Sequence, residues 1–487
     1  MLDRLNDRFG REIESLEALS VEMHLDLTDF PPICLAHASY MMASESEAVV
    51  VDPQRDVEMY IKAAEEHGAT IRHVFETHLH ADFVSGHREL AARTGARIYI
   101  GAEAGATFPH VPVRDGFELK VGKLSLRVLE TPGHTPESIC LVITDLEKSS
   151  SPWAVLTGDT LFLGDVGRPD LSKTFTPSQL AGMLYDSLHD KVLKLADDVL
   201  VYPAHGAGSL CGRNMRAERS STIGTERLTN YALQFKSKEE FVAELTSHLP
   251  ERPEYFLQDA EINRTGAAAL SDLPLLRAIA PGELKTMLEN GEIALDIRPG
   301  EDFAAVHVPG SVNIALSGQF ATWAGTILGL TAHPVLIAGS EQQLSEARIR
   351  LARVGIEELD GHLRGGVAGW KEAGLQLATI RQAGVSELNT QMEAGHLQVL
   401  DVRREPEWEA GHIENATWWP LDNFKVSPPE IDRETPIAVH CKGGYRSMIA
   451  CSLLQRAGFL NVINVVGGFD DWQQAKLPFV SEKPVGA

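Results

Sequence analysis

The chain has few cysteines and no long apolar run. Only five cysteines occur among its 487 residues, and they are widely scattered: Cys34, Cys140, Cys211, Cys441 and Cys451. An odd, dispersed set of this kind is not a disulfide framework and fits a reducing, cytoplasmic setting. The first 22 residues lack the uninterrupted apolar segment of a secretory signal or a membrane anchor. Their apolar residues recur at near-helical spacing, so we expect a helical extension over residues 1–22.

Basic residues are outnumbered by acidic ones. The chain has 44 lysines and arginines against 68 aspartates and glutamates, which leaves a net charge of -24. An extended surface for nucleic acid or for an anionic membrane needs a basic face, so this balance argues against both partners. The length exceeds what a single hydrophobic core usually serves, and we therefore expect several domains.

Four apolar segments each end in a histidine or an aspartate. The first runs into residues 77–82, which lie between a β-branched strand pattern and a helical pattern. His78 and His80 alternate along this extended segment, so their side chains share a face. The other strand-end residues are His134, Asp159 and His205. One such residue alone is more often a cap or a satisfied polar group, but four in series indicate a metal site.

This series resembles the metallo-β-lactamase fold, with the spacing of its glyoxalase II and persulfide dioxygenase branch, over residues 23–255. The resemblance implies an α/β fold, an αββα sandwich in which two sheets carry their helices outside. Strand and helix patterns alternate from Ile33 to Asp198 and are joined by glycine and proline turns, as such a sandwich requires.

The identity of the metal depends on Phe83. Hydrolases of this family commonly hold two zinc ions, and a histidine stands where this sequence has Phe83, which cannot ligate a metal. The persulfide dioxygenase branch implies instead one Fe(II) per chain, held by His78, His134 and Asp159. Such a triad leaves coordination positions for O2, substrate sulfur and water. Zinc is the alternative cofactor. The residues that would then orient the ligands and bound water are His80, Asp82 and His205.

Residues 167–170 resemble the Gly-Arg-x-Asp loop that this family carries beside its metal. Arg168 can bind a substrate carboxylate, or it can hold the loop by pairing with Asp170, and the sequence leaves both roles open. In either case we expect Arg168 to lie near the metal.

The C-terminal half is an internal repeat. Composition changes after Pro250, and residues 256–274 have the character of a linker. Residues 275–380 and 381–487, which we name the first and the second repeat, both contain an Asp-x-Arg strand end and a Gly-Gly-x-x-x-Trp ending. Each repeat resembles a rhodanese domain, a small doubly wound α/β fold around a parallel sheet.

The two repeats differ in their active-site loop. In the second, an apolar strand runs into Cys441-Lys442-Gly443-Gly444-Tyr445-Arg446 at the start of a helix. The helix N-terminus and the loop N–H groups, together with Lys442 and Arg446, are expected to favour a thiolate or a persulfide at Cys441. The loop length matches sulfurtransferases, whereas phosphatases of this fold carry a longer loop. The first repeat has no cysteine at residues 339–341 and should be catalytically dead.

The resemblance implies a persulfide dioxygenase fused to an inactive and an active rhodanese. The metal domain would oxidise a low-molecular-weight thiol persulfide with O2 to sulfite. Cys441 would move sulfur among persulfide, sulfite and thiosulfate, and the function would be sulfide detoxification. The thiol is not identified, and glutathione, coenzyme A and another bacterial thiol all stay open. The residues expected to bind substrates are Arg168, Asp401 and Arg403.

Two other functions stay open. A zinc-dependent thioester hydrolase of the glyoxalase II type would cleave thioesters without O2. A sulfurtransferase could instead use its N-terminal domain only to bind persulfide. For the first repeat we expect a role as a scaffold or in oligomerisation, and we expect the chain to form a homodimer or a homotetramer.

Overall fold

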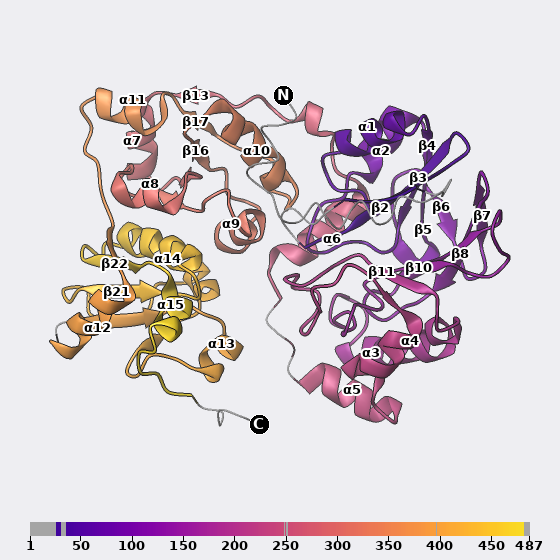
Figure 1. Ribbon diagram of the computed structural model, residues 1–487. Coiled ribbons are helices and arrows are strands. Elements are labelled where there is room, and N and C mark those ends of the chain that lie inside the picture. Colours follow the sequence, from indigo (N-terminus) through magenta and orange to yellow (C-terminus); the bar gives the residue numbers. More distant parts are fainter. Residues whose placement is uncertain (1–25, 31–35, 248, 250–251, 396, 482–487) are drawn as a thin grey trace, which may run out of the picture. The chain divides into compact units, whose positions relative to one another are not determined.

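The computed structural model describes residues 26–30, 36–247, 249, 252–395 and 397–481 (Figure 1). The helix predicted over residues 1–22 and the position of Cys34 lie outside these ranges. Contacts divide the chain into two units. Residues 36–79 and 86–249 make up most of the first unit, and residues 80–85 with 250–487 make up most of the second. Among the described residues, no helix combines the length and the apolar character needed to cross a bilayer.

The first unit contains two six-stranded sheets. One has the strand order β1-β2-β3-β4-β5-β6 and the other β12-β11-β10-β9-β8-β7. The first sheet consists of β1 (Asp26–Phe30), β2 (Ser39–Ser44), β3 (Glu47–Val51), β4 (Thr70–Glu76), β5 (Arg97–Gly101) and β6 (Val111–Val113). The second consists of β7 (Glu118–Val121), β8 (Leu124–Glu130), β9 (Ile139–Asp145), β10 (Ala154–Gly158), β11 (Leu200–Pro203) and β12 (Ser221–Thr222).

Strand β9 explains how these sheets form layers. Successive side chains of a strand point to opposite faces. Leu141 and Ile143 join the core between the two sheets, whereas Cys140 and Val142 join a second core under the helices. Because both faces of β9 are covered, its sequence is almost continuously apolar.

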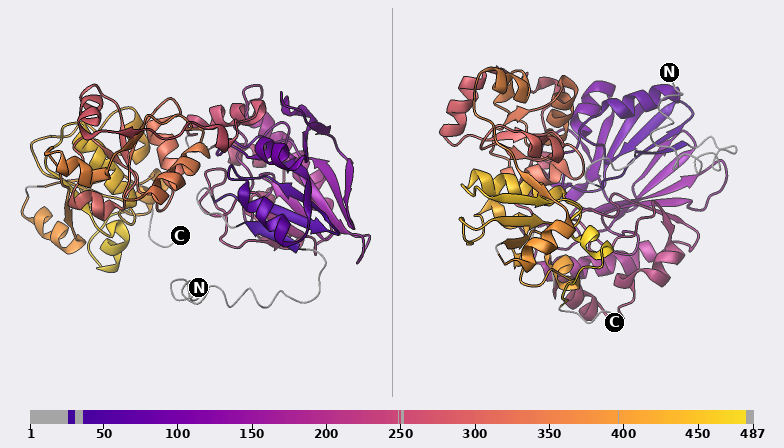
Figure 2. Two further views of the ribbon diagram at one scale, coloured as in Figure 1. Left: turned by 90° about the horizontal axis from the view of Figure 1, so that it is seen from above. Right: turned by 60° about the vertical axis from the view of Figure 1, so that its left-hand side comes forward.

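Helices cover the outer face of each sheet (Figures 1 and 2). Tyr60 of α1 and Leu90 of α2 pack with strand residues of the first sheet, and Leu184 of α3 and Phe241 of α5 pack with those of the second. The αββα sandwich expected from the sequence is therefore confirmed. The helices of this unit are α1 (Glu58–Glu66), α2 (His87–Thr94), α3 (Pro177–Asp190), α4 (Ile223–Thr229) and α5 (Lys238–Ser247), with short 3-10 turns at η3 (Ala102–Ala104), η4 (Val192–Lys194) and η5 (Tyr231–Leu233).

The two repeats of the second unit share one topology. The first has the sheet order β13-β17-β16-β14-β15 and the second β18-β22-β21-β19-β20, with parallel pairing throughout. The first contains β13 (Ala278–Ile279), α7 (Pro281–Glu289), β14 (Ala294–Asp296), α8 (Gly300–Ala305), β15 (Val312–Asn313), α9 (Phe320–Leu328), β16 (Val335–Ile337), α10 (Glu341–Ala352), β17 (Gly361–Leu363) and α11 (Gly366–Glu372). The second contains β18 (Arg381–Ala383), α12 (Val385–Glu393), β19 (Gln398–Asp401), α13 (Glu405–Ala410), β20 (Thr417–Trp418), η7 (Leu421–Lys425), β21 (Ile437–His440), α14 (Tyr445–Arg456), β22 (Val462–Val465) and α15 (Gly468–Gln474).

The shared Gly-Gly-x-x-x-Trp ending makes the same contacts in both repeats. Nε1 of Trp370 donates a hydrogen bond to Gln376 O over 2.8 Å, and Nε1 of Trp472 donates to Pro478 O over 2.9 Å. Each tryptophan thereby ties the last helix to the chain that leaves it. The internal repeat predicted from the sequence is confirmed at this level of detail.

The predicted linker, residues 256–274, begins as a helix. Residues 255–265 form α6 (Tyr255–Thr265), and a 3-10 turn, η6 (Leu270–Asp272), follows. The buried side chains of α6 recur three or four positions apart at Phe256, Asp259 and Asn263, so one face of the helix is covered. By its contacts α6 groups with the second unit, so a helix forms the first part of the segment expected to be a linker.

Candidate metal centre and sulfur-transfer site

His78, His134 and Asp159 meet at the ends of three strands. They follow β4, β8 and β10, and all three side chains are buried. Oδ2 of Asp159 lies 3.3 Å from Nε2 of His134 and 3.8 Å from Nε2 of His78. One ligand atom from each residue falls within a span of 4.8 Å. Three residues picked out along 82 positions of sequence thus converge on one point.

Neighbouring groups orient two of these ligands. Nδ1 of His134 lies 3.0 Å from Arg168 O, which can only accept, so this nitrogen carries the proton. Nδ1 of His205 lies 2.7 Å from Oδ1 of Asp159. Within the described residues, no hydrogen bond reaches Nε2 of His134 or Oδ2 of Asp159. Buried atoms of this kind are costly without a partner, and a cation bound between them would supply one. The residues therefore fit a metal.

The orientation of His78 is set by Asp52 through Thr77. Oδ1 and Oδ2 of Asp52 accept from the backbone N–H and the hydroxyl of Thr77 over 2.7 and 2.8 Å. The Thr77 oxygen can then accept from Nδ1 of His78 at 3.0 Å, which leaves Nε2 for a metal. Asp52 has a φ of +52°, which non-glycine residues rarely adopt. Sequence reasoning missed this residue, although it too follows an apolar strand, β3.

Electrostatics favour the protonation state that a metal requires. Burial alone would raise the pKa of Asp159, but His205, His78 and His134 outweigh burial and hold this pKa well below its usual range. Burial lowers the pKa of His134, with a further contribution from His205, against the opposing charge of Asp159. An ionised Asp159 and a neutral His134 are the forms in which these two residues ligate a cation.

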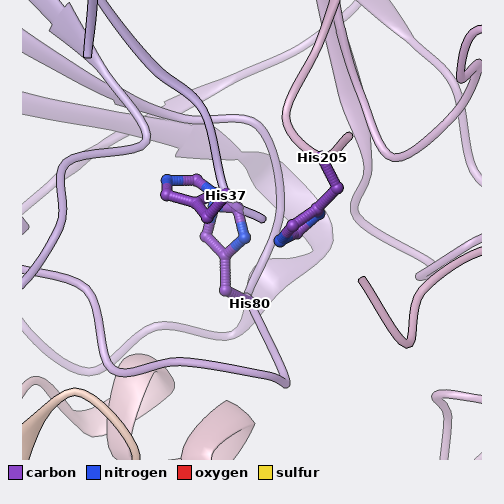
Figure 3. Close-up of side chains that lie close together, drawn as sticks. All are labelled: His37, His80 and His205. Carbon is purple, nitrogen blue, oxygen red and sulfur yellow. The ribbon is translucent and has the colours of Figure 1, made fainter. Parts of the chain in front are cut away.

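The other predicted residues form groups beside this triad. Ligand atoms of His37, His80 and His205 lie within 4.8 Å of one another, and Figure 3 shows the ring of His205 pointing toward the other two. Asp82, His205 and Cys211 form a similar group. Sequence reasoning missed His37, whose only signal is a polar residue in front of strand β2. The ring of Phe83 lies 4.4 Å from that of His80, so the residue that replaces a ligand packs on its neighbour.

Arg168 makes one of the two contacts considered for it. Its guanidinium pairs with Asp170 over 2.7 and 2.9 Å and donates to Leu210 O, and the side chain is almost fully buried. Its carbonyl accepts from His134, so Arg168 lies beside the centre as expected. The pairing holds the loop. Contact with a substrate carboxylate stays a prediction.

Cys441 lies between the end of β21 and the start of α14. Gly444 has a φ of +99°, and its N–H donates to Sγ of Cys441 over 3.1 Å. The N–H of Phe469, at the start of α15, donates to Cys441 O over 2.8 Å. A Cβ on Gly468 would lie 2.4 Å from that same oxygen, so only glycine allows α15 to approach the loop so closely.

The two cations of the loop have different surroundings. Lys442 is exposed, whereas Arg446 forms a two-bond pair with Glu407 of α13 over 2.6 and 2.7 Å. Burial would raise the pKa of Glu407, but hydrogen bonds and charge from Arg446 outweigh it and lower this pKa. Glu407 was not predicted, because nothing in the sequence links it to a residue 39 positions away.

Asp401 and Arg403 are paired with each other. Nη2 of Arg403 lies 2.6 Å from Oδ2 of Asp401 and 2.7 Å from Gly411 O, and the guanidinium lies 3.9 Å from the Phe469 ring. Both side chains are buried. These contacts brace the strand end, and substrate binding by the two residues stays a prediction.

The first repeat contacts the Cys441 loop but has no cysteine of its own at the equivalent turn. The hydroxyl of Tyr445 donates to Ala315 O over 2.8 Å. Where the second repeat has its cysteine, the first has residues 339–341, and Ser340 Oγ there accepts from Gln343 N as the cap of α10. The side chain at this turn caps a helix, and the inactivity of the first repeat stays a prediction.

Comparison with known proteins places these sites in families. Residues 32–205 match the metallo-β-lactamase superfamily, and residues 280–373 and 384–475 each match the rhodanese-like domain. Over 220 residues, the chain is 30% identical to the mitochondrial persulfide dioxygenase ETHE1 of Homo sapiens, which covers 44% of this chain and 77% of that protein. The chain belongs to the metallo-β-lactamase superfamily. Two tandem rhodanese-like domains follow its metallo-β-lactamase domain, in the order predicted.

Two further relatives of this metallo-β-lactamase fusion are informative. A hydroxyacylglutathione hydrolase of Francisella tularensis subsp. novicida is 31% identical over 172 residues, which are 35% of this chain and 63% of that protein. A crystal structure of a metallo-β-lactamase from Staphylococcus aureus subsp. aureus COL has a TM-score of 0.63 at 32% identity and covers 69% of this chain and 98% of its own. That similarity extends beyond residues 32–205, into the segment that follows the metal domain.

Proposed function

We propose that the metallo-β-lactamase domain oxidises a low-molecular-weight thiol persulfide with O2, using one Fe(II), and that Cys441 carries sulfur in a coupled transfer. A persulfide, O2 and water would give the thiol, sulfite and two protons. The outer sulfur loses four electrons in this reaction and O2 gains them, so no other oxidant is needed. The function would be sulfide detoxification.

The observation that most supports this proposal is a group of three metal-binding side chains near a position where a fourth is absent. His78, His134 and Asp159 offer one carboxylate and two imidazoles, the donor set of ferrous oxygenases. Phe83 stands where hydrolases of the fold carry a further histidine. Similarity to a persulfide dioxygenase over 77% of that protein points the same way.

The residues around the centre have defined tasks in this proposal. A bound ferrous ion would supply the one-electron chemistry through which O2 reacts with sulfur. His78, His134 and Asp159 would hold it, and three ligands leave positions for both substrates. His205 fixes the rotation of the Asp159 carboxylate, and Arg168 O fixes the tautomer of His134. Burial of the triad keeps bulk water away from a reactive sulfur species.

In the second repeat, we propose that the Cys441 thiolate accepts the outer sulfur of a donor as Cys–S–SH. The S–S bond of the donor breaks in this step and its remaining sulfur leaves as a thiolate. Attack by sulfite on the outer sulfur of Cys441 would then form thiosulfate and release the Cys441 thiolate. The N–H of Gly444 points at Sγ and stabilises negative charge there. Because one product of the first site is a substrate of the second, their fusion raises the local concentration of sulfite.

The test is anaerobic purification with elemental analysis, followed by O2 uptake with glutathione persulfide and, separately, coenzyme A persulfide. We expect about one iron per chain and persulfide-dependent O2 uptake that is lost in His134→Ala and kept in Cys441→Ala. The exposed His333→Ala is the matched control for the loss of an imidazole. Iron without O2 uptake on any persulfide would contradict the proposal, and relative rates would rank the thiols.

A zinc-dependent thioester hydrolase is the second candidate. The similarity to a hydroxyacylglutathione hydrolase and the second group of ligand atoms, from Asp82, His205 and Cys211, favour it. Two zinc ions per chain with thioester cleavage in the absence of O2 would establish this activity in place of the dioxygenase.

We propose that the first repeat acts as a scaffold or in oligomerisation, within a cytoplasmic homodimer or homotetramer. Its packing against the second repeat supports a structural role, because Asn313 N and Gly310 O bond to Ser452 and Arg456 of α14. Deletion of residues 272–380 should change the mass of the assembly in light scattering. Unchanged assembly with altered kinetics would instead indicate a role in placing substrate.

A further inference from the structure

The segment from His78 to Gly86 carries predicted metal-site residues on irregular backbone. It lies between β4 and α2 and is buried. Because it belongs to no sheet or helix, its backbone N–H and C=O groups need other hydrogen-bond partners. Leu79 N donates to Oε1 of Glu137 over 2.9 Å, and Gly86 N donates to Pro53 O over 3.0 Å. These bonds hold the two ends of the segment. The middle of the segment, residues 80–85, forms hydrogen bonds with a later part of the chain.

One side chain binds three backbone groups of that middle part. Nδ2 of Asn263 donates to His80 O and to Phe83 O, both over 2.7 Å, and its Oδ1 accepts from Ser85 N over 2.8 Å. Asn263 is fully buried. Reversing the amide would place Oδ1 against two carbonyl oxygens, so a single orientation satisfies all three groups.

Asn263 belongs to a part of the chain outside the metallo-β-lactamase match. It lies on α6, after residues 32–205, and residues 80–85 group by contacts with this later segment. The first repeat adds one more bond, because Val84 N donates to Arg353 O over 2.6 Å. The loop that follows the ligand His78 is therefore shaped by residues about 180 to 270 positions further along the chain.

We infer that Asn263 is a positioning residue for the metal centre, which sets the path of residues 80–85 and with it the placement of His80 and Asp82. The inference rests on the proposed metal centre, but it does not depend on which metal is held or which reaction follows. Two of the three hydrogen bonds from this buried amide fix the backbone at the two ends of the four-residue stretch from His80 to Phe83, and the third binds Ser85. The stretch begins two residues after the ligand His78.

The substitution that tests this most sharply is Asn263→Asp. It keeps the shape and the acceptor for Ser85 N, but it replaces the donor to His80 O and Phe83 O with an oxygen. Charge would be poorly tolerated at this place, because burial, with Asp82 and Glu357, already raises the pKa of neighbouring Asp259 well above its usual range. Asn263→Ala removes all three bonds without adding charge. Gln258→Glu, an exposed amide-to-acid change on the same helix, is the matched control.

Two readouts other than turnover decide the outcome in the full-length, metal-loaded protein. The first is the rate at which a chelator removes the metal, and the second is hydrogen exchange of the peptide that contains residues 80–86. We expect both Asn263 variants to release metal about 10 to 100 times faster than the parent and to exchange faster in this peptide. The control variant should match the parent. Sulfur transfer at Cys441 should be kept in all, which shows that the second unit is folded.

A variant that folds and releases metal at the parental rate would overturn the inference. If Asn263→Asp does not fold, Asn263→Ala decides by the same criteria. Loss of Cys441 activity in both variants would assign Asn263 a general structural role instead. The inference and the proposed function can fail separately. A parent that holds zinc and consumes no O2 ends the dioxygenase proposal, yet the comparison of metal release still decides the role of Asn263.

Discussion

Nδ1 of His205 donates to Oδ1 of Asp159 over 2.7 Å, and this bond leaves Oδ2 facing His134 at 3.3 Å. A carboxylate has two equivalent oxygens, so a ligand role requires that one of them be turned toward the metal and kept there. His205 provides that constraint from the end of β11, which pairs in parallel with β10, the strand that precedes Asp159. The two residues lie at the same edge of the sheet because parallel strands end at the same side.

His205→Ala should weaken metal binding without removing a direct ligand. We expect the dissociation constant of the metal to rise about 10 to 100 times, as for other residues that hold a ligand in place. His205→Asn keeps a nitrogen donor bonded to Cγ, as Nδ1 is, and should restore part of the affinity. Competition with a chromogenic chelator measures both values. The exposed His333→Ala should bind as the parent does, and equal affinity in His205→Ala would contradict this role.

The strand-end residues could be predicted from the sequence because their signal is local. His78, His134, Asp159 and His205 each follow an apolar run, and the sheet then brings the run ends together. The repeat was recognisable for the same reason, since Asp-x-Arg and Gly-Gly-x-x-x-Trp are short motifs. What the sequence could not decide was which of its two possible partners Arg168 contacts. Both a substrate carboxylate and Asp170 were open from the sequence, and the structure shows the pairing with Asp170.

Residues that act across long separations could not be predicted. Asn263 contacts residues 178 to 183 positions away, and α6 was read as a linker because its covered face is short and partly polar. Glu407 likewise meets Arg446 from another helix. Such pairs depend on how helices and strands pack in the folded protein. No periodic pattern in the sequence indicates that packing.

Gly468 and Gly366 occupy equivalent places in the two repeats. Substituting each in turn distinguishes an effect on the Cys441 loop from an effect on folding. Gly468 has a φ of +58°, and a Cβ there would lie 2.4 Å from Cys441 O. Gly366 in the first repeat has a φ of +56°, and a Cβ there would lie 2.7 Å from Ala338 O. We expect Gly468→Ala to reduce thiosulfate sulfurtransferase activity at least about 10-fold, because the loop must shift. Gly366→Ala introduces the same strain beside a loop without a cysteine and should keep most of that activity.

Both glycine variants should show lower stability in urea unfolding, since a left-handed residue costs about 1–2 kcal/mol for alanine. Gly384→Ala is the control, because its φ of -81° is ordinary and a Cβ there meets nothing within 4 Å. Equal loss of sulfur transfer in Gly366→Ala and Gly468→Ala would contradict the view that only the second repeat is catalytic.

The Glu407–Arg446 pair predicts a pH dependence of stability. The pKa of Glu407 is lowered from its usual 4.5 in the folded protein, so its contribution is present above about pH 4.5 and is lost as the pH falls through the folded value. Glu407→Gln should destabilise the second repeat by about 1–3 kcal/mol at pH 7, as for a charged hydrogen bond. The difference from the parent should shrink below pH 4.5. The exposed Glu405→Gln, on the same helix, should show no such difference, and a pH-independent gap would refute the assignment.

Tyr445 tests whether the first repeat does more than assemble the protein. Its hydroxyl bonds to Ala315 O of the first repeat, while its backbone belongs to the loop that begins at Cys441. Tyr445→Phe removes this hydroxyl and keeps the ring. If the first repeat holds the loop in place, kcat/KM for sulfur transfer should fall about 2- to 10-fold, the equivalent of one net hydrogen bond of about 0.5–1.5 kcal/mol.

The oligomeric state and O2 uptake should remain unchanged in Tyr445→Phe, because the altered bond lies in the second unit and far along the chain from His78. Tyr185→Phe, whose ring packs on Phe241 at 5.4 Å in the first unit, is the matched loss of a tyrosine hydroxyl and should leave sulfur transfer intact. A change in oligomeric mass with unaltered kcat/KM would show that the contact serves assembly alone. Lower kcat/KM in an intact assembly would mean that a repeat without a cysteine still contributes to catalysis, by shaping the loop of its neighbour.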